Sequence, residues 1–181
     1  MEKTGPCAPS LPRTAAILIP AILLAVFALA GCLGNSQSPA EAGMFTYPNA
    51  TVYIISTTGN YNVTAQVAAT QEQQEFGLMF RDSLPEGAGM IFPFSSRGNY
   101  AFYMKNMRIP LDIIYAAPVA EGLKDNYAVV KVTENIQPCS KDPCPLDYSG
   151  DGVSIVLEVP AGYAQARGIG PGDRLIVTYS K

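Results

Sequence analysis

The chain consists largely of short segments rich in β-branched and aromatic residues, separated by turns rich in glycine and proline. Segments of this length and composition are typical of β-strands. Two stretches, 71–84 and 162–168, have patterns that predict short helices. Many short strands with few helices predict a mainly β domain, built as an antiparallel sandwich or barrel. The expected strands are 51–56, 61–68, 89–94, 99–105, 111–117, 126–135, 153–159 and 174–180.

The N-terminal residues have the features of an export signal. Lys3 and Arg13 precede an uncharged apolar run over 15–30. A basic start followed by about 15 apolar residues is typical of a secretory signal peptide, and a membrane span needs roughly 20. The run ends in Leu-Ala-Gly-Cys, which resembles the lipobox of prokaryotic lipoproteins and implies that Cys32 is lipidated. The alternative is an uncleaved anchor helix with an incidental cysteine.

The remaining chain divides into a linker and one domain. Residues 32–46 are rich in Gly, Ser, Pro and Ala without periodicity, which predicts a flexible tether. We expect residues 47–181 to form a single domain after a signal peptide over 1–31. Both interpretations of the N-terminus place this domain outside the cytoplasm. We therefore expect a protein anchored to the outer face of the cytoplasmic membrane or of another envelope membrane, with that membrane as a partner.

The composition excludes several classes of function. The chain contains no histidine, which removes Ser-His-Asp catalysis and His-ligated metal sites. The net charge is −3 and basic residues do not cluster, so we expect no nucleic-acid partner. We also expect no cofactor and no metal.

Two cysteines remain in the expected domain, Cys139 and Cys144. Two cysteines five residues apart in an oxidising compartment predict a local disulfide. A redox pair and a two-thiolate metal site are the alternatives. Redox pairs usually have Cys-x-x-Cys spacing, and a structural metal needs further soft ligands.

Six blocks, taken in order, carry a resemblance to one family. They are Phe76–Arg81, Gly89–Phe92, Phe102–Asn106, Ile109–Ile113, Leu157–Gly162 and Gly172-Asp173. They resemble the family called domain of unknown function 192, and the resemblance covers nearly all of the domain. It implies a compact β-sandwich of jelly-roll type with small helices, and we accordingly expect a single antiparallel β-sandwich. It implies no established activity, and Tyr103 stands where the family usually has Trp.

Several polar residues within these blocks follow or interrupt apolar runs. A charge in an apolar strand must face solvent or be paired, because an isolated buried charge is very unfavourable. One interpretation is an exposed face or a structural ion pair such as Arg81–Glu158. The other is a polar cluster at the mouth of the sandwich that holds an anionic or polyhydroxy ligand. The predicted ligand-binding residues are Arg81, Lys105, Asn106, Asp112 and Glu158.

Other residues suggest further chemistry. Met79, Met90, Met104 and Met107 are thioethers suited to Cu(I), although methionine also fills gaps beside aromatic rings. Asp112 and Glu158 are a potential acid and base for hydrolysis. Tyr100, Tyr103 and Tyr115 are potential sugar-binding platforms, with core packing as the alternative.

We therefore expect a lipid-anchored, non-enzymatic module that binds a small polar ligand or a surface partner. A carboxylate-dependent hydrolase acting on cell-envelope polysaccharide is one alternative. A structural envelope component is the other.

Overall fold

The computed structural model describes residues 45–120 and 123–180. The predicted signal peptide, Cys32 and the expected tether up to residue 44 lie outside this part of the chain. Within the described part, no helix is both long and apolar enough to cross a membrane. The elements in chain order are β1 (Asn49–Ser56), β2 (Gly59–Val67), α1 (Gln71–Phe76), β3 (Ala88–Gly98), β4 (Ala101–Phe102), β5 (Leu111–Pro118), β6 (Asn126–Ile136), β7 (Asp147–Tyr148), β8 (Val153–Pro160), α2 (Tyr163–Arg167) and β9 (Arg174–Tyr179).

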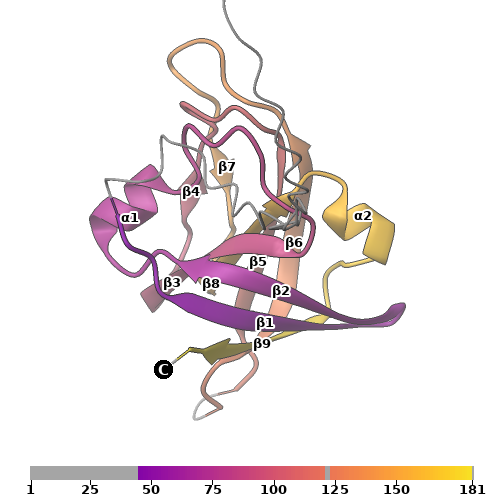
Figure 1. Cartoon of the computed structure of the whole chain (residues 1–181). Helices are drawn as coiled ribbons and strands as arrows, with labels where there is room; N and C mark the ends of the chain where they lie inside the picture. The colour runs from indigo at the N-terminus through magenta and orange to yellow at the C-terminus, as the bar shows by residue number, and fades with distance from the viewer. Residues whose placement is uncertain (1–44, 121–122, 181) are drawn as a thin grey trace, which may run out of the picture. The chain divides into compact units, whose positions relative to one another are not determined.

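The main sheet closes into a seven-stranded barrel, so the prediction of an antiparallel β-sandwich is wrong (Figure 1). The strand order is β1-β2-β3-β8-β5-β6-β9, and β9 closes the barrel by pairing with both β1 and β6. Closure leaves no exposed sheet edge. One pair, β2 with β3, is parallel, because the connection through α1 carries the chain across before β3 begins. The predictions of a mainly β domain and of short helices are confirmed.

Most of the predicted strands are present with small changes at their ends. The first two form the expected hairpin, with Ser56 opposite Gly59. The expected strand 99–105 is reduced to β4, two residues that pair with β7 in a separate small sheet. The chain leaves strand geometry after Phe102, and Asn106 has a left-handed backbone with φ of 57°. The short strand β7 was not predicted.

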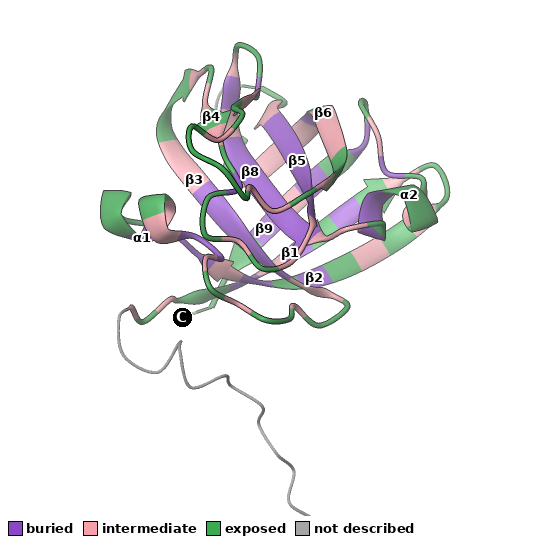
Figure 2. Cartoon of the chain, turned by 90° about the horizontal axis from the view of Figure 1, so that it is seen from above, coloured by how far each residue is buried: buried purple, intermediate pink, exposed green. Residues whose placement is uncertain are grey.

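The domain has two hydrophobic cores on opposite sides of the same strands. The inner core fills the barrel with residues from all seven of its strands and from α2, including Val52, Ile114 and Leu157. The outer core lies on the outer face of β3, β8 and β5, where Met90, Val156 and Ile113 are buried. Figure 2 shows the buried residues concentrated along these three central strands. Because side chains alternate along a strand, β8 supplies Leu157 to the inner core and Val156 and Glu158 to the outer side.

Gly89 allows β3 to approach β8 closely next to Glu158. A Cβ atom at Gly89 would lie 2.6 Å from the backbone oxygen of Glu158 and 3.0 Å from a methyl group of Val63. Such contacts are shorter than real Cβ atoms make, so a larger residue would force the two strands apart. The close approach fixes the position from which Glu158 points outward.

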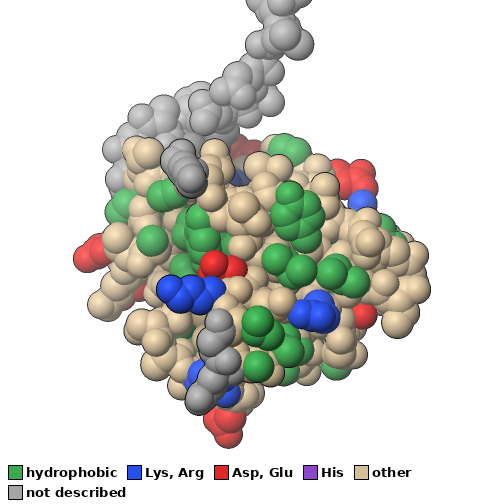
Figure 3. Space-filling model, turned by 90° about the horizontal axis from the view of Figure 1, so that it is seen from below, with side chains coloured by type: hydrophobic (Ala, Val, Ile, Leu, Met, Phe, Trp, Pro, Cys, Tyr) green, Lys and Arg blue, Asp and Glu red, His purple; other side chains and the backbone are tan. Residues whose placement is uncertain are grey.

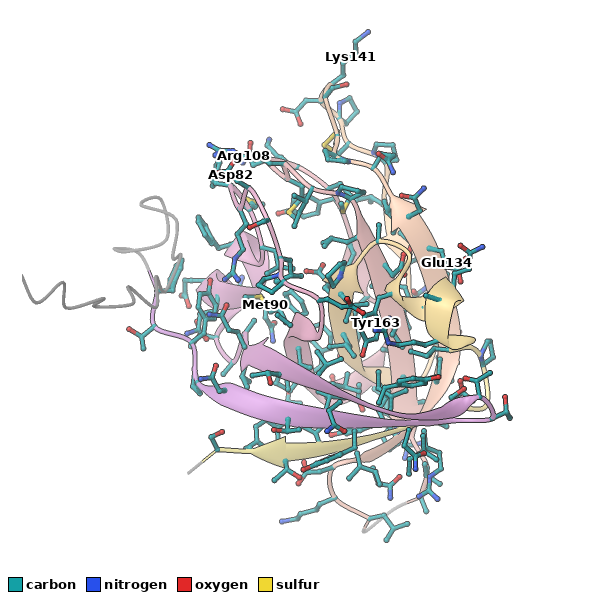
Figure 4. The ribbon with its side chains drawn as sticks, turned by 45° about the vertical axis from the view of Figure 1, so that its right-hand side comes forward. Asp82, Met90, Arg108, Glu134, Lys141 and Tyr163 are labelled. Atoms are coloured by element: carbon teal, nitrogen blue, oxygen red, sulfur yellow. A yellow bond between two sulfur atoms is a disulfide. The ribbon has the colours of Figure 1, made fainter. Side chains whose placement is uncertain are left out.

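Cys139 and Cys144 are joined by a disulfide, as predicted. The bridge closes a small loop between β6 and β7. Lys141 lies at the tip of this loop and points away from the barrel (Figure 4). The backbone N–H of Cys139 also donates to the carbonyl oxygen of Met104 at 3.0 Å, which attaches the loop to the outer core.

Candidate functional site

A pocket of about 190 Å³ opens in the outer core, and we call it the aromatic pocket. It lies between the outer face of β3 and β8 on one side, and α1, β4 and their adjoining loops on the other. Six of its fifteen lining residues are aromatic, and Glu158 is the buried ionisable residue among them. The lining residues are Gln71, Gln74, Glu75, Phe76, Gly77, Leu78, Met79, Phe92, Phe94, Tyr100, Ala101, Phe102, Tyr103, Met107 and Glu158.

Helix α1 is fixed to the barrel by polar contacts at its start. Thr70 caps the helix in a capping box with Gln73, whose side-chain oxygen accepts from the Thr70 backbone N–H at 3.0 Å. The side-chain amide of Gln74 donates to the carbonyl oxygens of Ala68 and Pro93. The helix ends at Gly77, which has a positive φ of 50°. This turn directs Leu78 and Met79 back over the outer core.

The aromatic rings of the opposite wall pack against one another. Phe94 and Tyr100 are stacked, with ring centroids 3.6 Å apart. Phe102 meets Phe92 edge-on at 5.2 Å. The Tyr100 hydroxyl donates to the carbonyl oxygen of Ser96 at 2.6 Å, which holds that ring in place. The wall is therefore preformed, which lowers the entropy lost when a ligand binds.

Glu158 is the chemically distinctive residue of the pocket. Its side chain projects from β8 between Met90 of β3 and Ile113 of β5, and the residue is only 7% exposed. Burial raises the pKa of Glu158 to about 8, and the nearby Arg81 guanidinium opposes part of that shift. Burial therefore favours the protonated form of this carboxyl at neutral pH.

Arg81 lies near Glu158, as the sequence analysis proposed, but it is not a lining residue of the pocket. Its guanidinium donates a hydrogen bond to the side-chain oxygen of Gln66 on β2. Gln66 of β2 pairs with Met90 of β3, and Met90 pairs with Glu158 of β8, so these residues form one row on the outer face of the sheet. Arg81 lies along this row because it is hydrogen-bonded to Gln66. Its positive charge lowers the pKa of Glu158, against the larger effect of burial.

Asp112 has a different position and role. It is fully buried, and its carboxylate accepts backbone N–H groups of Asn135 at 2.8 Å, Gly162 at 3.1 Å and Ala164 at 2.9 Å. These bonds connect β5 with β6 and with the first turn of α2. Asp112 is opposite Val159 of the inner core, whereas Glu158 is opposite Ile113 of the outer core. The two carboxyls therefore point to opposite faces of the sheet.

The other predicted site residues lie in the loops. Lys105 forms an exposed ion pair with Asp142 at 3.2 Å. Asn106 adopts its left-handed backbone so that its carbonyl oxygen accepts from Phe80 N–H at 2.9 Å. This bond joins the loop after α1 to the loop after β4. A nearby ion pair, Arg108 with Asp82 at 2.7 Å, spans the same two loops (Figure 4). The structure thus brings Arg81 and Glu158 together and leaves Lys105, Asn106 and Asp112 outside the pocket.

The aromatic and methionine side chains have divided roles. Tyr100 and Tyr103 line the pocket, whereas Tyr115 is buried in the outer core. Met79 and Met107 also line it, and Met90 and Met104 are core residues. Over residues 45–120 and 123–180, no group of three or more His, Cys, Asp or Glu side chains is arranged to hold a metal ion. The sequence contained these rings, but no spacing signal showed that six of them surround one cavity.

A half-buried polar network that the sequence did not predict lies beside the outer core. Asp147 of β7 accepts from the Tyr115 hydroxyl and from the Lys131 ammonium, both at 2.7 Å. Burial raises the pKa of Asp147, but hydrogen bonds from Lys131 and Tyr115 outweigh this effect and leave that pKa below its usual value. Burial and the hydrogen bond to Asp147 raise the pKa of the Tyr115 hydroxyl. This network attaches the small β4–β7 sheet to the barrel.

Elsewhere the surface has less organised features. On the face seen from below, hydrophobic side chains occur in small groups separated by charged and polar ones (Figure 3). Scattered exposed apolar residues are normal for a soluble domain. The aromatic pocket is the candidate site because it combines six aromatic rings with a buried carboxyl.

Comparisons with known proteins identify one family and two solved structures of similar fold. No curated protein matches the chain. A solved structure from Sinorhizobium meliloti, named as a candidate transcription regulator, shares 29% identity with a TM-score of 0.64; the match covers 76% of this chain and 98% of that one. A protein of unknown function from Novosphingobium aromaticivorans also shares 29% identity, with a TM-score of 0.62, and covers 80% and 99%. The model of the DUF192 family, described as uncharacterized, matches residues 53–177. The chain therefore belongs to the DUF192 family, as its sequence blocks indicated.

Proposed function

We propose that this domain is a non-enzymatic binding module whose small ligand occupies the aromatic pocket. The observation that carries the proposal is a preformed cavity with six aromatic rings and one buried carboxyl, Glu158. Ligand sites are typically concave and mainly apolar, with a few polar groups that orient the ligand. The ligand therefore has an apolar body, with one polar group that meets Glu158.

The arrangement of the acidic residues supports binding rather than hydrolysis. A pair of catalytic carboxyls must flank one substrate bond, yet Asp112 and Glu158 point to opposite faces of the sheet. Asp112 also has a structural role, because it accepts hydrogen bonds from three backbone N–H groups. We likewise propose no nucleic-acid partner, because the chain has a net charge of −3.

A panel of small amines, alcohols and carboxylic acids with apolar bodies tests the proposal. We expect at least one compound to raise the unfolding temperature of the wild-type protein, by mass action. Tyr103 is 40% exposed and lines the pocket. Replacing it, Tyr103→Ala, is expected to weaken binding of that compound roughly fivefold or more, because a ring contact is lost. Calorimetric titration measures the change.

Tyr53→Ala is the matched control. Tyr53 is also exposed, at 43%, but it lies on β1 and not in the pocket. This variant is expected to bind the same compound as tightly as wild type. Equal weakening in both variants, or a panel without any stabilising compound, would contradict the assignment of the pocket.

We also propose that the domain is exported and held at an envelope membrane through a lipid on Cys32. The support is the sequence pattern over residues 1–32. Cys32→Ser is expected to release the protein from membranes or to block its processing, as measured by fractionation and intact mass. Unchanged membrane association together with unchanged mass would exclude the lipid anchor.

A further inference from the structure

The charged residues that line the aromatic pocket are all acidic. Its ionisable carboxyls are Glu75 and Glu158, and none of the lining residues is a lysine or arginine. Six aromatic rings make up much of the remaining wall. The face of an aromatic ring carries negative electrostatic potential and attracts a cation within about 6 Å. Carboxyls and ring faces therefore favour the same kind of ligand.

The size of the cavity restricts that ligand further. About 190 Å³ is less than the roughly 300–1,000 Å³ of pockets for drug-sized molecules. An inorganic cation would need several oxygen ligands in one place, and over the described residues no group of three or more His, Cys, Asp or Glu side chains is arranged to hold a metal ion. A small organic cation with methyl or methylene groups fits better, because its carbon atoms contact the rings while its charge lies near Glu158.

We infer that the aromatic pocket binds an organic ammonium ion, with its charge balanced by Glu158 and its alkyl groups held by Phe94, Tyr100 and the neighbouring rings. This inference rests on the proposed function, because it names the ligand class of the same pocket. Aromatic cages beside a carboxylate are well suited to quaternary ammonium groups. An anionic ligand would face the two carboxyls without a cation in the lining.

The charged and titratable groups around Glu158 determine how binding depends on pH. Arg81, which follows α1, favours the carboxylate, whereas burial disfavours it more strongly. Tyr115 of β5 senses the charge of Glu158, and Glu75 of α1 and Tyr100 line the same cavity. An entering ammonium ion adds a second positive charge to that of Arg81 beside the carboxyl, so the carboxyl ionises and one proton is released to solvent for each cation bound. Binding is therefore expected to strengthen as pH rises.

Choline and dimethylbutanol provide a direct test. Dimethylbutanol is the uncharged analogue of choline, with a carbon atom in place of the ammonium nitrogen. We expect choline to bind more tightly than dimethylbutanol, and to gain about tenfold or more in affinity between about pH 6 and about pH 9. Dimethylbutanol is expected to bind with little pH dependence. Calorimetry in buffers of different ionisation enthalpy measures both the affinity and the proton released.

Glu158→Gln removes the charge and keeps the shape of the protonated side chain. This variant is expected to lose the preference for choline and to retain binding of dimethylbutanol. Glu134→Gln, the same change at an exposed residue of β6 outside the pocket, is the control and is expected to keep the preference. Equal affinity of wild type for the two compounds, or unchanged choline binding by Glu158→Gln, would overturn the inference.

The outcomes separate this inference from the proposed function. If panel compounds bind in the pocket and choline does not, the ligand class is wrong and the binding module remains. If no compound binds there, both fail. Vesicles of phosphatidylcholine identify the source of the ammonium group. Binding to them that free choline displaces indicates a lipid head group, and choline binding without vesicle binding indicates a soluble compound.

Discussion

Replacing Asp112 with alanine is expected to destabilise the domain by about 4 kcal/mol or more. The change removes the acceptor of three backbone N–H groups, on Asn135, Gly162 and Ala164. Each group would then be buried without its partner, and hydrogen bonds to a charged acceptor contribute about 1.5–3 kcal/mol each. Since a domain of this size has roughly 5–15 kcal/mol of total stability, the variant is expected to be close to unfolding. Urea denaturation followed by circular dichroism measures the change.

Two further variants keep the Asp112 prediction testable if alanine prevents folding. Asp112→Asn retains one acceptor oxygen and is expected to show an intermediate loss. Asp82→Ala removes a carboxyl from the exposed ion pair with Arg108 and is expected to change stability by less than about 1 kcal/mol. A loss for Asp112→Ala no larger than that of Asp82→Ala would show that the carboxylate does not hold α2 to the barrel.

The free energy of unfolding of the wild-type protein is expected to fall as pH rises from about 5 to about 9. Replacing Glu158 with glutamine is expected to abolish this fall. Burial raises the pKa of Glu158 to about 8 in the folded state, whereas the unfolded chain has an ordinary value near 4.5. Between these values the folded protein holds a proton that the unfolded chain has released. The stabilisation that Glu158 contributes is therefore fully present below its pKa in the unfolded chain. It is lost as pH rises through its pKa in the folded protein. Its size is on the order of 4 kcal/mol.

The measurement is urea unfolding of wild type and Glu158→Gln across this pH range. The difference between the two proteins isolates Glu158 from other titrating groups. The two are expected to have similar stabilities at about pH 5, with the variant more stable at about pH 9. Glu75→Gln is the control and is expected to follow the wild-type profile, because Glu75 is exposed. Parallel curves for wild type and Glu158→Gln would show that Glu158 titrates normally.

Asp112 and Glu158 occur in the same kind of sequence pattern but have different roles. Both lie in apolar strands, and both belong to blocks that resemble the same family. Asp112 accepts a hydrogen bond from the backbone N–H of Gly162, and the positive φ of 83° at that position favours glycine. Asp173, in the last block, similarly accepts from the backbone N–H of Gly170 at 2.9 Å. Much of the resemblance therefore reflects what holds this barrel together.

The candidate site was predicted only in part. Glu158 and Arg81 were selected because a charge in or beside an apolar run needs an explanation, and that argument requires only local sequence. Lys105 and Asn106 were selected by proximity to the same blocks, and they proved to lie in exposed loops. The aromatic wall was not predicted, because Phe76, Phe94 and Tyr103 come from separate elements whose meeting depends on the fold.

The sequence alone determined most of the local structure of the domain. The β-rich runs specified most of the strands, and alternation placed Leu157 and Glu158 on opposite faces of β8. Only the tertiary structure decided that the sheet closes through β9 into a barrel, and that an outer core forms over β3, β8 and β5. The physical reason is that propensity and alternation act between neighbours in the chain. Barrel closure and pocket formation depend on contacts such as Tyr53 with Ile176, which are far apart in sequence and form only when the whole domain packs.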